Sequence, residues 1–394
     1  MPSQIVSGNH NGSVPSITVY RDAFVGASAT TNSPTLLANA NVFNFPTAGV
    51  VSKFTVILDT APGVGCSRTF TLYLNGSSTS VSVTISGTDK VGVDLSNTLS
   101  VSAGDSIQIY ASYSGAVAAT YIKHSAIFTP DTDYEYIFGG FTSANAALNR
   151  YLYFGGVNNA GSATESDTNI VMPCAGTIKK LFIRTSTAPG GTDTLSVTAR
   201  KNGVSQTLVA TITGTETYAQ DTSNSFTVAA GDNLTFLVGG TRSRGSLTWS
   251  FVFVPSTTTD IPHFTAAMSN FVTSQYANLD HSYNSTCRGT GTYQLKSERA
   301  VAMYVTVKTA PGTGTSKIFT LTKNGSATDL VVTISGTNTT GNATGSVSVA
   351  DGDVLSIVYS VSGSPVASVG SVGLVFEAND SVITNQVMNI IINC

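Results

Sequence analysis

Charged residues are scarce in this sequence. They make up 10% of its 394 residues, whereas an ordinary soluble protein has about a quarter. Long solvated helices need Glu, Lys and Arg on their exposed faces, so this scarcity argues against a helical protein. The net charge is −3 and no basic run is present, which argues against a protein that holds nucleic acid through its phosphates. We therefore expect no nucleic-acid partner.

Long apolar segments and cysteine motifs are also missing. No window approaches 18 apolar residues, which predicts that there is no membrane span. The N-terminus lacks a cationic start followed by an apolar stretch, so we expect no secretory signal peptide. The cysteines lie far apart without C-x-x-C spacing, which disfavours zinc and redox motifs and predicts free thiols. They are Cys66, Cys174, Cys287 and Cys394.

Motifs that carry catalysis are not visible either. The four histidines show no H-x-H or H-E-x-x-H arrangement, and we expect them to be isolated surface or loop residues. They are His10, His124, His263 and His281. No G-x-S-x-G elbow is present. Asp131, Asp133 and Glu135 have the two-residue spacing of calcium loops, but the remaining ligands are missing, so we interpret them as an acidic linker. We expect no catalytic residue, metal site or cofactor, and no enzyme.

The residues that are abundant favour β structure. Hydrophobic residues make up 41% of the chain, and 15 Tyr and 18 Phe are enough to fill several small cores. Ser, Thr and Gly dominate the remainder, as is typical of strands joined by tight turns. The composition therefore predicts a folded β protein and says little about chemistry.

An internal repeat is the strongest signal in the chain. Three blocks carry the same four turns in the same order: Pro-Gly, then Asn-Gly 13 residues later, then Gly before Thr, then Gly-Asp. The prolines stand at 62, 189 and 311, so the period is 127 and then 122 residues. The Asn-Gly pairs are at 75–76, 202–203 and 324–325, and the Gly-Asp pairs are at 104–105, 231–232 and 352–353. Because each repeat is as long as a whole domain, it predicts three modules.

Between these turns apolar and polar residues alternate, as in half-buried strands. Asn-Gly tolerates positive φ at both central positions of a type I′ turn, so each block should contain a β-hairpin there. We expect the recurring aspartates, Asp105, Asp232 and Asp353, to cap their own turns. With about eight strands per block, the sequence predicts an all-β protein of three tandem antiparallel β-sandwich (jelly-roll) modules of about 120 residues each.

The repeat also sets the predicted boundaries. They are an N-terminal arm at 1–16, module 1 at 17–130, module 2 at 134–255, module 3 at 262–378 and an apolar C-terminal segment at 379–394. That last segment is either a final strand of module 3 or an arm that adds a strand to a neighbour. Its candidate assembly contacts are Val382, Ile383, Val387, Met388, Ile390, Ile391 and Ile392.

Aromatic residues suggest a further contact. Tyr134, Tyr136, Tyr151 and Tyr153 lie in the densest aromatic stretch, which suits either a contact between modules or a bound ligand. Trp249 is the single tryptophan and stands among alternating apolar residues of a closing strand, which favours a place in the core. Block three departs from the others at 295–298, where Leu-Lys-Ser-Glu replaces Pro-x-Ala-Gly. This is either a different loop or a contact with a neighbouring protein.

The run from the Pro-Gly turn through Asn-Gly to Gly-Asp and an apolar strand resembles the jelly-roll modules of bacteriophage and other viral structural proteins. The Gly-Asp turn before a long apolar strand is also similar to tumour necrosis factor-like and complement-like jelly rolls, which trimerise. The resemblance implies a non-enzymatic structural component of a virion (capsid decoration, fibre or spike-like), made in the host cytoplasm. It also implies a homo-oligomer, a trimer by analogy, in contact with other virion proteins.

Two alternatives stay open. A glycan- or receptor-binding adhesin would use similar modules, and viral spikes often serve both purposes. The three modules of one chain could also form a pseudo-threefold cluster, provided that the short linkers span the distance between them.

Overall fold

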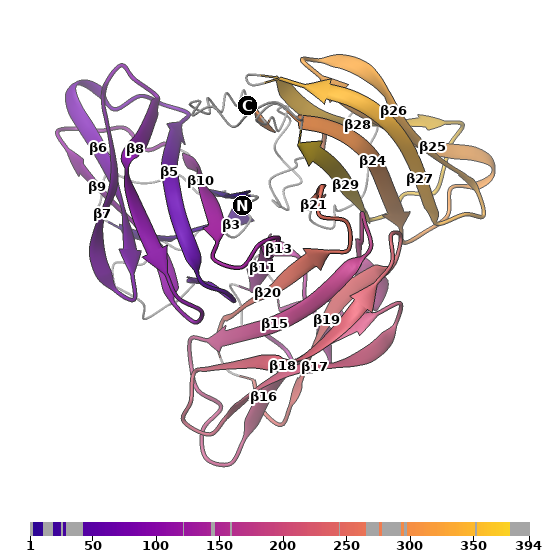
Figure 1. Ribbon diagram of the computed structural model, residues 1–394, viewed down its shortest axis with the longest axis horizontal. Coiled ribbons are helices and arrows are strands. Elements are labelled where there is room, and N and C mark those ends of the chain that lie inside the picture. Colours follow the sequence, from indigo (N-terminus) through magenta and orange to yellow (C-terminus); the bar gives the residue numbers. More distant parts are fainter. Residues whose placement is uncertain are drawn as a thin grey trace.

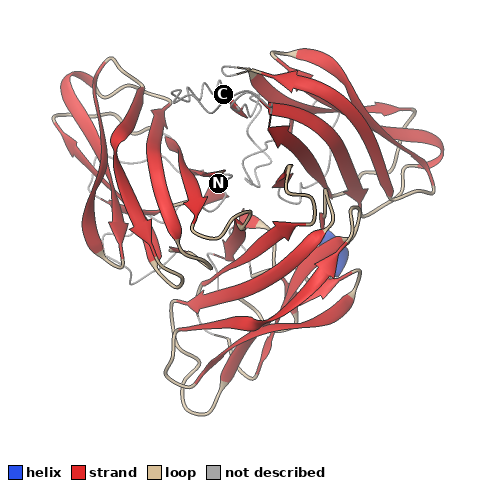
Figure 2. Ribbon diagram, viewed as in Figure 1, coloured by secondary structure: helices blue, strands red, loops and turns tan. Residues whose placement is uncertain are grey.

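The computed structural model describes residues 3–10, 19–24, 27–28, 42–120, 122–142, 146–157, 160–243, 245–264, 276–277, 293–294, 298–350 and 353–378. Within these residues the chain is built of strands, and its single helix is the short 3-10 turn η1 (Glu165–Asp167) (Figure 2). The predicted all-β fold of antiparallel sandwich modules is therefore confirmed.

Module 1 is a sandwich of two sheets, ordered β3-β1-β10-β5-β8 and β2-β9-β6-β7, with β4 also paired to β9. Its strands are β1 (Gln4–His10), β2 (Val19–Asp22), β3 (Ala27–Ser28), β4 (Phe43–Asn44), β5 (Gly49–Leu58), β6 (Gly63–Leu74), β7 (Ser77–Gly87), β8 (Val91–Val101), β9 (Ser106–Ser114) and β10 (Ile122–Pro130). Except for the parallel β1–β3 pair, neighbouring strands are antiparallel.

Module 2 repeats this order as β13-β11-β20-β15-β18 and β12-β19-β16-β17, with β14 paired to β19. Its strands are β11 (Tyr136–Thr142), β12 (Arg150–Tyr151), β13 (Gly155–Val157), β14 (Ile170–Val171), β15 (Gly176–Thr185), β16 (Thr194–Lys201), β17 (Val204–Thr213), β18 (Tyr218–Val228), β19 (Asn233–Gly240) and β20 (Leu247–Pro255).

Module 3 has the orders β21-β29-β24-β27 and β22-β28-β25-β26, with β23 paired to β28. Its strands are β21 (Asp260–Phe264), β22 (Tyr276–Ala277), β23 (Tyr293–Gln294), β24 (Glu298–Val307), β25 (Gly312–Lys323), β26 (Ser326–Gly336), β27 (Thr340–Val349), β28 (Val354–Ser362) and β29 (Gly370–Ala378). Each closing strand, β10, β20 or β29, therefore lies between the first strand of its module and β5, β15 or β24.

The period-two pattern places one side of each strand in a core. In β6, Phe70 and Leu72 are fully buried, whereas Thr71 and Tyr73 between and beside them are half-buried. Three clusters of buried apolar side chains result, each centred on one module. Burial of apolar surface between the two sheets is the main force that holds each sandwich together.

In each module the Asn-Gly turn and the Gly-Asp turn are joined by hydrogen bonds, and we call this pair of turns the clasp. Asn75, Asn202 and Asn324 take positive φ of 50°, 50° and 52°, as the hairpins require. Each amide Nδ2 donates to the aspartate of the following Gly-Asp turn (Asp105, Asp232 and Asp353), at 2.7 Å in all three modules. The other carboxylate oxygen of each aspartate accepts a backbone N–H three residues earlier. The predicted capping role is confirmed, and the clasp explains why both turns recur.

The three modules lie around a common centre (Figure 1). The sheets that contain β10, β20 and β29 face this centre, and we call them the inner sheets; the sheets that contain β6, β16 and β25 face away and are the outer sheets. The arrangement is the pseudo-threefold cluster that the sequence left as one alternative.

Two sequence predictions differ from the structure. Residues 4–10 do not form a free arm: they are β1, which pairs with β10 from Gln4↔Phe128 to Asn9↔Lys123 and fills a place in the inner sheet. His124 and His263 are not surface or loop residues, because they lie in β10 and β21 with 4% and 9% of their surface exposed. Residues 379–394, and with them the proposed assembly contacts from Val382 to Ile392, lie outside the described residues.

Candidate functional site: two equivalent joints between modules

The first joint connects modules 1 and 2. Strand β4 of module 1 contacts β15 and β20 of module 2, and Ser250 Oγ donates to the carbonyl oxygen of Asn44 at 2.6 Å. The side chain of Gln4 pairs with the backbone of Ile137: its Nε2 donates to Ile137 O at 2.8 Å and its Oε1 accepts from Ile137 N at 2.7 Å. Ile137, Phe141 and Val252 of module 2 belong to the core cluster of module 1.

The second joint connects modules 2 and 3. Strand β14 of module 2 contacts β24 and β29 of module 3, and the Val171 N–H donates to Ser371 Oγ at 3.0 Å. Phe264, Ala302 and Val375 of module 3 belong to the core cluster of module 2. Phe264 meets Phe138 edge to face with ring centroids 4.6 Å apart.

The two joints use the same surfaces. Gly176 pairs with Pro255 in module 2, and Glu298 pairs with Ala378 at the same place in module 3. When the modules are aligned on these pairs, Val252 of module 2 corresponds to Val375 of module 3. The Gly-Asp turn also repeats its contact: a Cβ placed at Gly104 would lie 3.8 Å from the ring of Phe182, and one at Gly231 would lie 3.9 Å from the ring of Tyr304. Phe182 and Tyr304 correspond as well, so each module presents one edge to the inner sheet of the next.

A buried ion cluster lies in the first joint. Glu135 stands just before β11 and exposes 1% of its side chain. Its carboxylate lies 2.9 Å from Lys179 Nζ and 2.8 Å from Lys180 Nζ, and it accepts a hydrogen bond from Thr47 Oγ1 of module 1. Burial alone would raise the pKa of Glu135, but the bonds from both lysines and from Thr47 outweigh it and hold the pKa below its usual value. Residues from both modules therefore share one cluster, in which a buried carboxylate is paired with two lysines.

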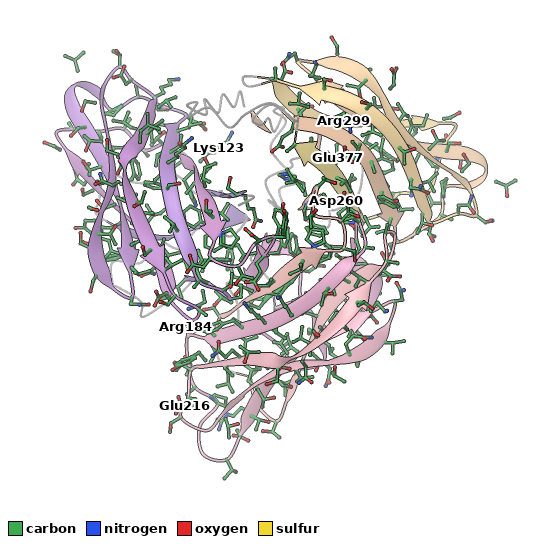
Figure 3. The ribbon with its side chains drawn as sticks, in the orientation of Figure 1. Lys123, Arg184, Glu216, Asp260, Arg299 and Glu377 are labelled. Carbon is green, nitrogen blue, oxygen red and sulfur yellow. The ribbon has the colours of Figure 1, made fainter. Side chains whose placement is uncertain are left out.

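The second joint holds a different cluster at the corresponding place. Asp260 follows Pro255 by five residues, as Glu135 follows Pro130, and it lies where modules 2 and 3 meet (Figure 3). Cys174 replaces Thr47, and the buried Cys174 thiol donates a hydrogen bond to Asp260. Val301 and Ala302 stand where Lys179 and Lys180 stand in module 2.

Without those lysines the carboxylate behaves differently. Burial raises the pKa of Asp260, and the nearby Glu377 raises it further. Burial also raises the pKa of the Cys174 thiol, so this cysteine is a buried structural thiol rather than a reactive one. On the strands of this joint, Arg299 of β24 forms an ion pair with Glu377 of the neighbouring strand β29 (Figure 3).

The aromatic residues that the sequence singled out are divided between core and surface. Trp249 and Tyr136 expose 2% and 1% and lie in the core cluster of module 2, which Phe264 and Val375 of module 3 also join. Tyr134, Tyr151 and Tyr153 are half-buried. These five side chains therefore do not form one platform, and Tyr136 lies near enough to Glu298 and Asp260 of module 3 for both to raise its pKa, after the larger effect of burial.

The acidic residues of the linker are also divided between exposed and buried positions. Asp131 and Asp133 are exposed, whereas Glu135 is buried among lysines. Among the described residues, no group of three or more His, Cys, Asp or Glu side chains is placed to hold a metal ion. Leu295, Lys296 and Ser297 of the divergent third block lie outside the described residues, and Glu298 begins β24.

Sequence reasoning missed the joints because their residues lie far apart in the chain. One signal was available: Glu135 and Asp260 are carboxylates at the same distance after Pro130 and Pro255.

Sequence reasoning also missed a second repeated pattern, D-x-S-N at 94–97 and 221–224. In each copy the aspartate accepts two backbone N–H bonds within its own bulge and one from the preceding strand, which lies in the other sheet of the module. These bonds lower the pKa of Asp94 and Asp221 against the effect of burial.

No protein-family model matches the sequence, and no curated protein is similar to it. No helix in the described part of the chain has the length and apolar character needed to cross a membrane.

Proposed function

We propose that this protein is a non-enzymatic structural component of a virion, such as a capsid-decorating, fibre or spike-like protein, that acts through protein-protein contacts. The observation that carries the proposal is the repeated joint: the edge of one module docks on the inner sheet of the next in the same way twice. A chain that reuses one contact to fix its modules around a centre is suited to present surfaces at fixed positions.

The joints have the character of permanent contacts. They merge apolar residues of one module into the core of the next, and the first joint buries a fully paired carboxylate. Interfaces that resemble a divided core are typical of obligate assemblies. The modules are thus expected to act as one rigid unit.

The resemblance to trimeric jelly rolls also fits this unit. The jelly rolls that the sequence resembles trimerise, whereas here three modules of one chain face a common centre (Figure 1). The proposal therefore needs no association of chains at this contact. It requires other virion proteins as partners and places the protein on the particle.

The test is whether the chain is part of particles. Particles are purified by density gradient from cells that carry the sequence, and the chain is quantified by mass spectrometry against the most abundant particle protein. We expect a fixed ratio across the particle peak. A chain found only in the soluble fraction at every salt concentration contradicts the proposal.

A matched pair of variants links this result to the joints. A Cβ at Gly373 would lie 2.8 Å from the carbonyl oxygen of Val171, so Gly373→Ala should open the second joint. At Gly345, within module 3, a Cβ would meet only the side chain of Leu330, at 3.3 Å from Cδ1 and 3.9 Å from Cβ, so Gly345→Ala serves as the control. Gly373→Ala should be lost from particles, and Gly345→Ala should be retained.

A further inference from the structure

Three tyrosines gather on the outer sheet of module 1, on the opposite side of the sandwich from the inner sheet. Tyr20 lies on β2, Tyr73 on β6 and Tyr110 on β9, and Tyr20 is directly opposite Tyr110 in the strand register. The ring centroids are 5.4 Å apart for Tyr20 and Tyr73, 4.9 Å for Tyr20 and Tyr110, and 5.2 Å for Tyr73 and Tyr110. We call this group the tyrosine cluster.

The strand alternation turns these rings away from the core. Ile109 and Ala111, on either side of Tyr110, are buried, as is Leu72 beside Tyr73. All three tyrosines remain half-exposed, and burial together with the neighbouring rings Tyr73 and Tyr110 raises the pKa of Tyr20. The Tyr20 hydroxyl is therefore a neutral hydrogen-bonding group at ordinary pH.

A ladder of hydroxyl groups continues the same face. Thr71, which pairs with Tyr110, shares a hydrogen bond with Ser82 at 3.0 Å, and Thr69 shares one with Thr84 at 2.9 Å. These side chains are uncharged and stand at outward positions of β6 and β7. The face thus combines aromatic rings with closely spaced hydroxyls.

The corresponding faces of modules 2 and 3 lack this combination. In module 2, Tyr151 matches Tyr20, but Leu237 matches Tyr110 and Arg200 matches Tyr73. Arg200 lies over the ring of Tyr151 at 5.7 Å and is held by Glu165, with Nε to Oε1 at 2.8 Å. In module 3, Val358 and Thr322 stand at the positions of Tyr110 and Tyr73. The cluster is therefore a property of module 1 and not a requirement of the fold.

We propose that the tyrosine cluster of module 1 is a binding site for a neutral carbohydrate. The C–H groups of a sugar ring carry partial positive charge and pack against the negative face of an aromatic ring, while the tyrosine and Thr/Ser hydroxyls exchange hydrogen bonds with the sugar hydroxyls. Tyrosine offers both kinds of contact at a small cost in side-chain entropy. The Tyr, Thr and Ser side chains named above are uncharged, so an acidic sugar finds no counter-ion among them. This site does not depend on the structural role proposed above.

The test uses the full chain on an array of neutral and acidic oligosaccharides, followed by calorimetric titration with the best neutral binder. The variant is Tyr73→Thr with Tyr110→Leu, which introduces residues that modules 3 and 2 already carry at these positions, so the sandwich should keep its fold. Ile318→Thr is the control, because Ile318 is a half-buried, outward residue on the same sheet of module 3.

We expect the wild-type chain to bind a neutral oligosaccharide, the double variant to lose at least tenfold in affinity with an unchanged melting temperature, and the control to stay within twofold. The inference is overturned if no neutral sugar binds, if only acidic sugars bind, or if the double variant binds as well as the wild type. Incorporation of the double variant into particles is measured separately. Its retention leaves the structural role intact whatever the sugar result, so the two proposals can fail independently.

Discussion

Removal of one lysine should weaken the first joint measurably. Lys180→Ala gives module 2 the residue that module 3 has at the corresponding position, and it takes away one of the three side chains that satisfy Glu135. Loss of one partner from a buried ion pair costs about 3–5 kcal/mol. Because Lys180 is 26% exposed and Lys179 remains 2.9 Å from the carboxylate, we expect about 2 kcal/mol here.

Hydrogen exchange can measure this cost at the joint itself. The amide of Ile137 donates to Gln4 Oε1 of module 1, so its exchange requires the joint to open. A loss of about 2 kcal/mol corresponds to about 30-fold faster exchange. Glu135→Gln should give a similar loss, and the double variant less than the sum of the two, with a coupling energy of at least about 1 kcal/mol.

An exposed ion pair provides the control for this cycle. Arg242 and Asp193 lie 3.3 Å apart within module 2, with 45% and 34% of their side chains exposed. Arg242→Ala should change stability by less than about 0.5 kcal/mol and leave the Ile137 amide unaffected. If Lys180→Ala accelerates that amide less than threefold and couples to Glu135→Gln by less than about 0.5 kcal/mol, the lysines do not hold the joint and the reasoning is refuted.

Three other predictions concern the modules and the second joint. Burial lowers the pKa values of His124 and His263 to about 3 and about 4, so both are neutral in the fold, whereas an unfolded histidine titrates near 6.5. Their contribution to stability is therefore complete above about pH 6.5. As the pH falls from about 6.5 toward those values, the unfolded state binds protons that the folded state does not, and the free energy of unfolding falls by up to about 1.4 kcal/mol per pH unit and histidine. Urea unfolding between pH 7 and 4 should show this slope, and His124→Val with His263→Phe, the residues found at the corresponding positions of other modules, should flatten it. Asp232→Ala should cost module 2 about 1–2 kcal/mol in urea unfolding, because it frees Asn202 Nδ2 and the Ala229 amide, whereas Asp193→Ala should cost less than about 0.5 kcal/mol. Gly373→Ala should accelerate exchange of the Val171 amide at least tenfold, with no change in Gly345→Ala; equal rates in both variants would show that the joint tolerates the methyl group.

Local patterns were enough to predict the sandwiches. The Asn-Gly hairpins and Gly-Asp turns depend on residues close together in sequence, and the period-two alternation fixes which side of a strand is buried. The prediction was wrong for residues 4–10, because the Gly, Asn and Ser content of the N-terminal segment suggested an arm, while β1 is held by its backbone pairing with β10. Composition contains no information about such a distant pairing.

The joints were not predicted because, apart from the repeated carboxylate after Pro130 and Pro255, they depend on how whole modules are placed. Gln4 and Ile137 are 133 positions apart in the sequence, and the type of neither residue indicates a contact between modules. The tyrosine cluster was missed for a similar reason: Tyr20, Tyr73 and Tyr110 stand on three strands, and only the strand register brings their rings within 5.4 Å. By contrast, the aromatic stretch around Tyr136 was conspicuous in the sequence but is partly a core.

The short connections between modules have a consequence for how the molecule responds to dilution. Only residues 131–135 separate β10 from β11, and only residues 256–259 separate β20 from β21. A short tether gives its two ends an effective concentration in the millimolar range. A trimer of separate chains dissociates when its concentration falls below its dissociation constant, whereas these joints are formed within one molecule. The arrangement of the three modules is therefore independent of protein concentration, and a single copy, diluted without limit, keeps all of its surfaces in place.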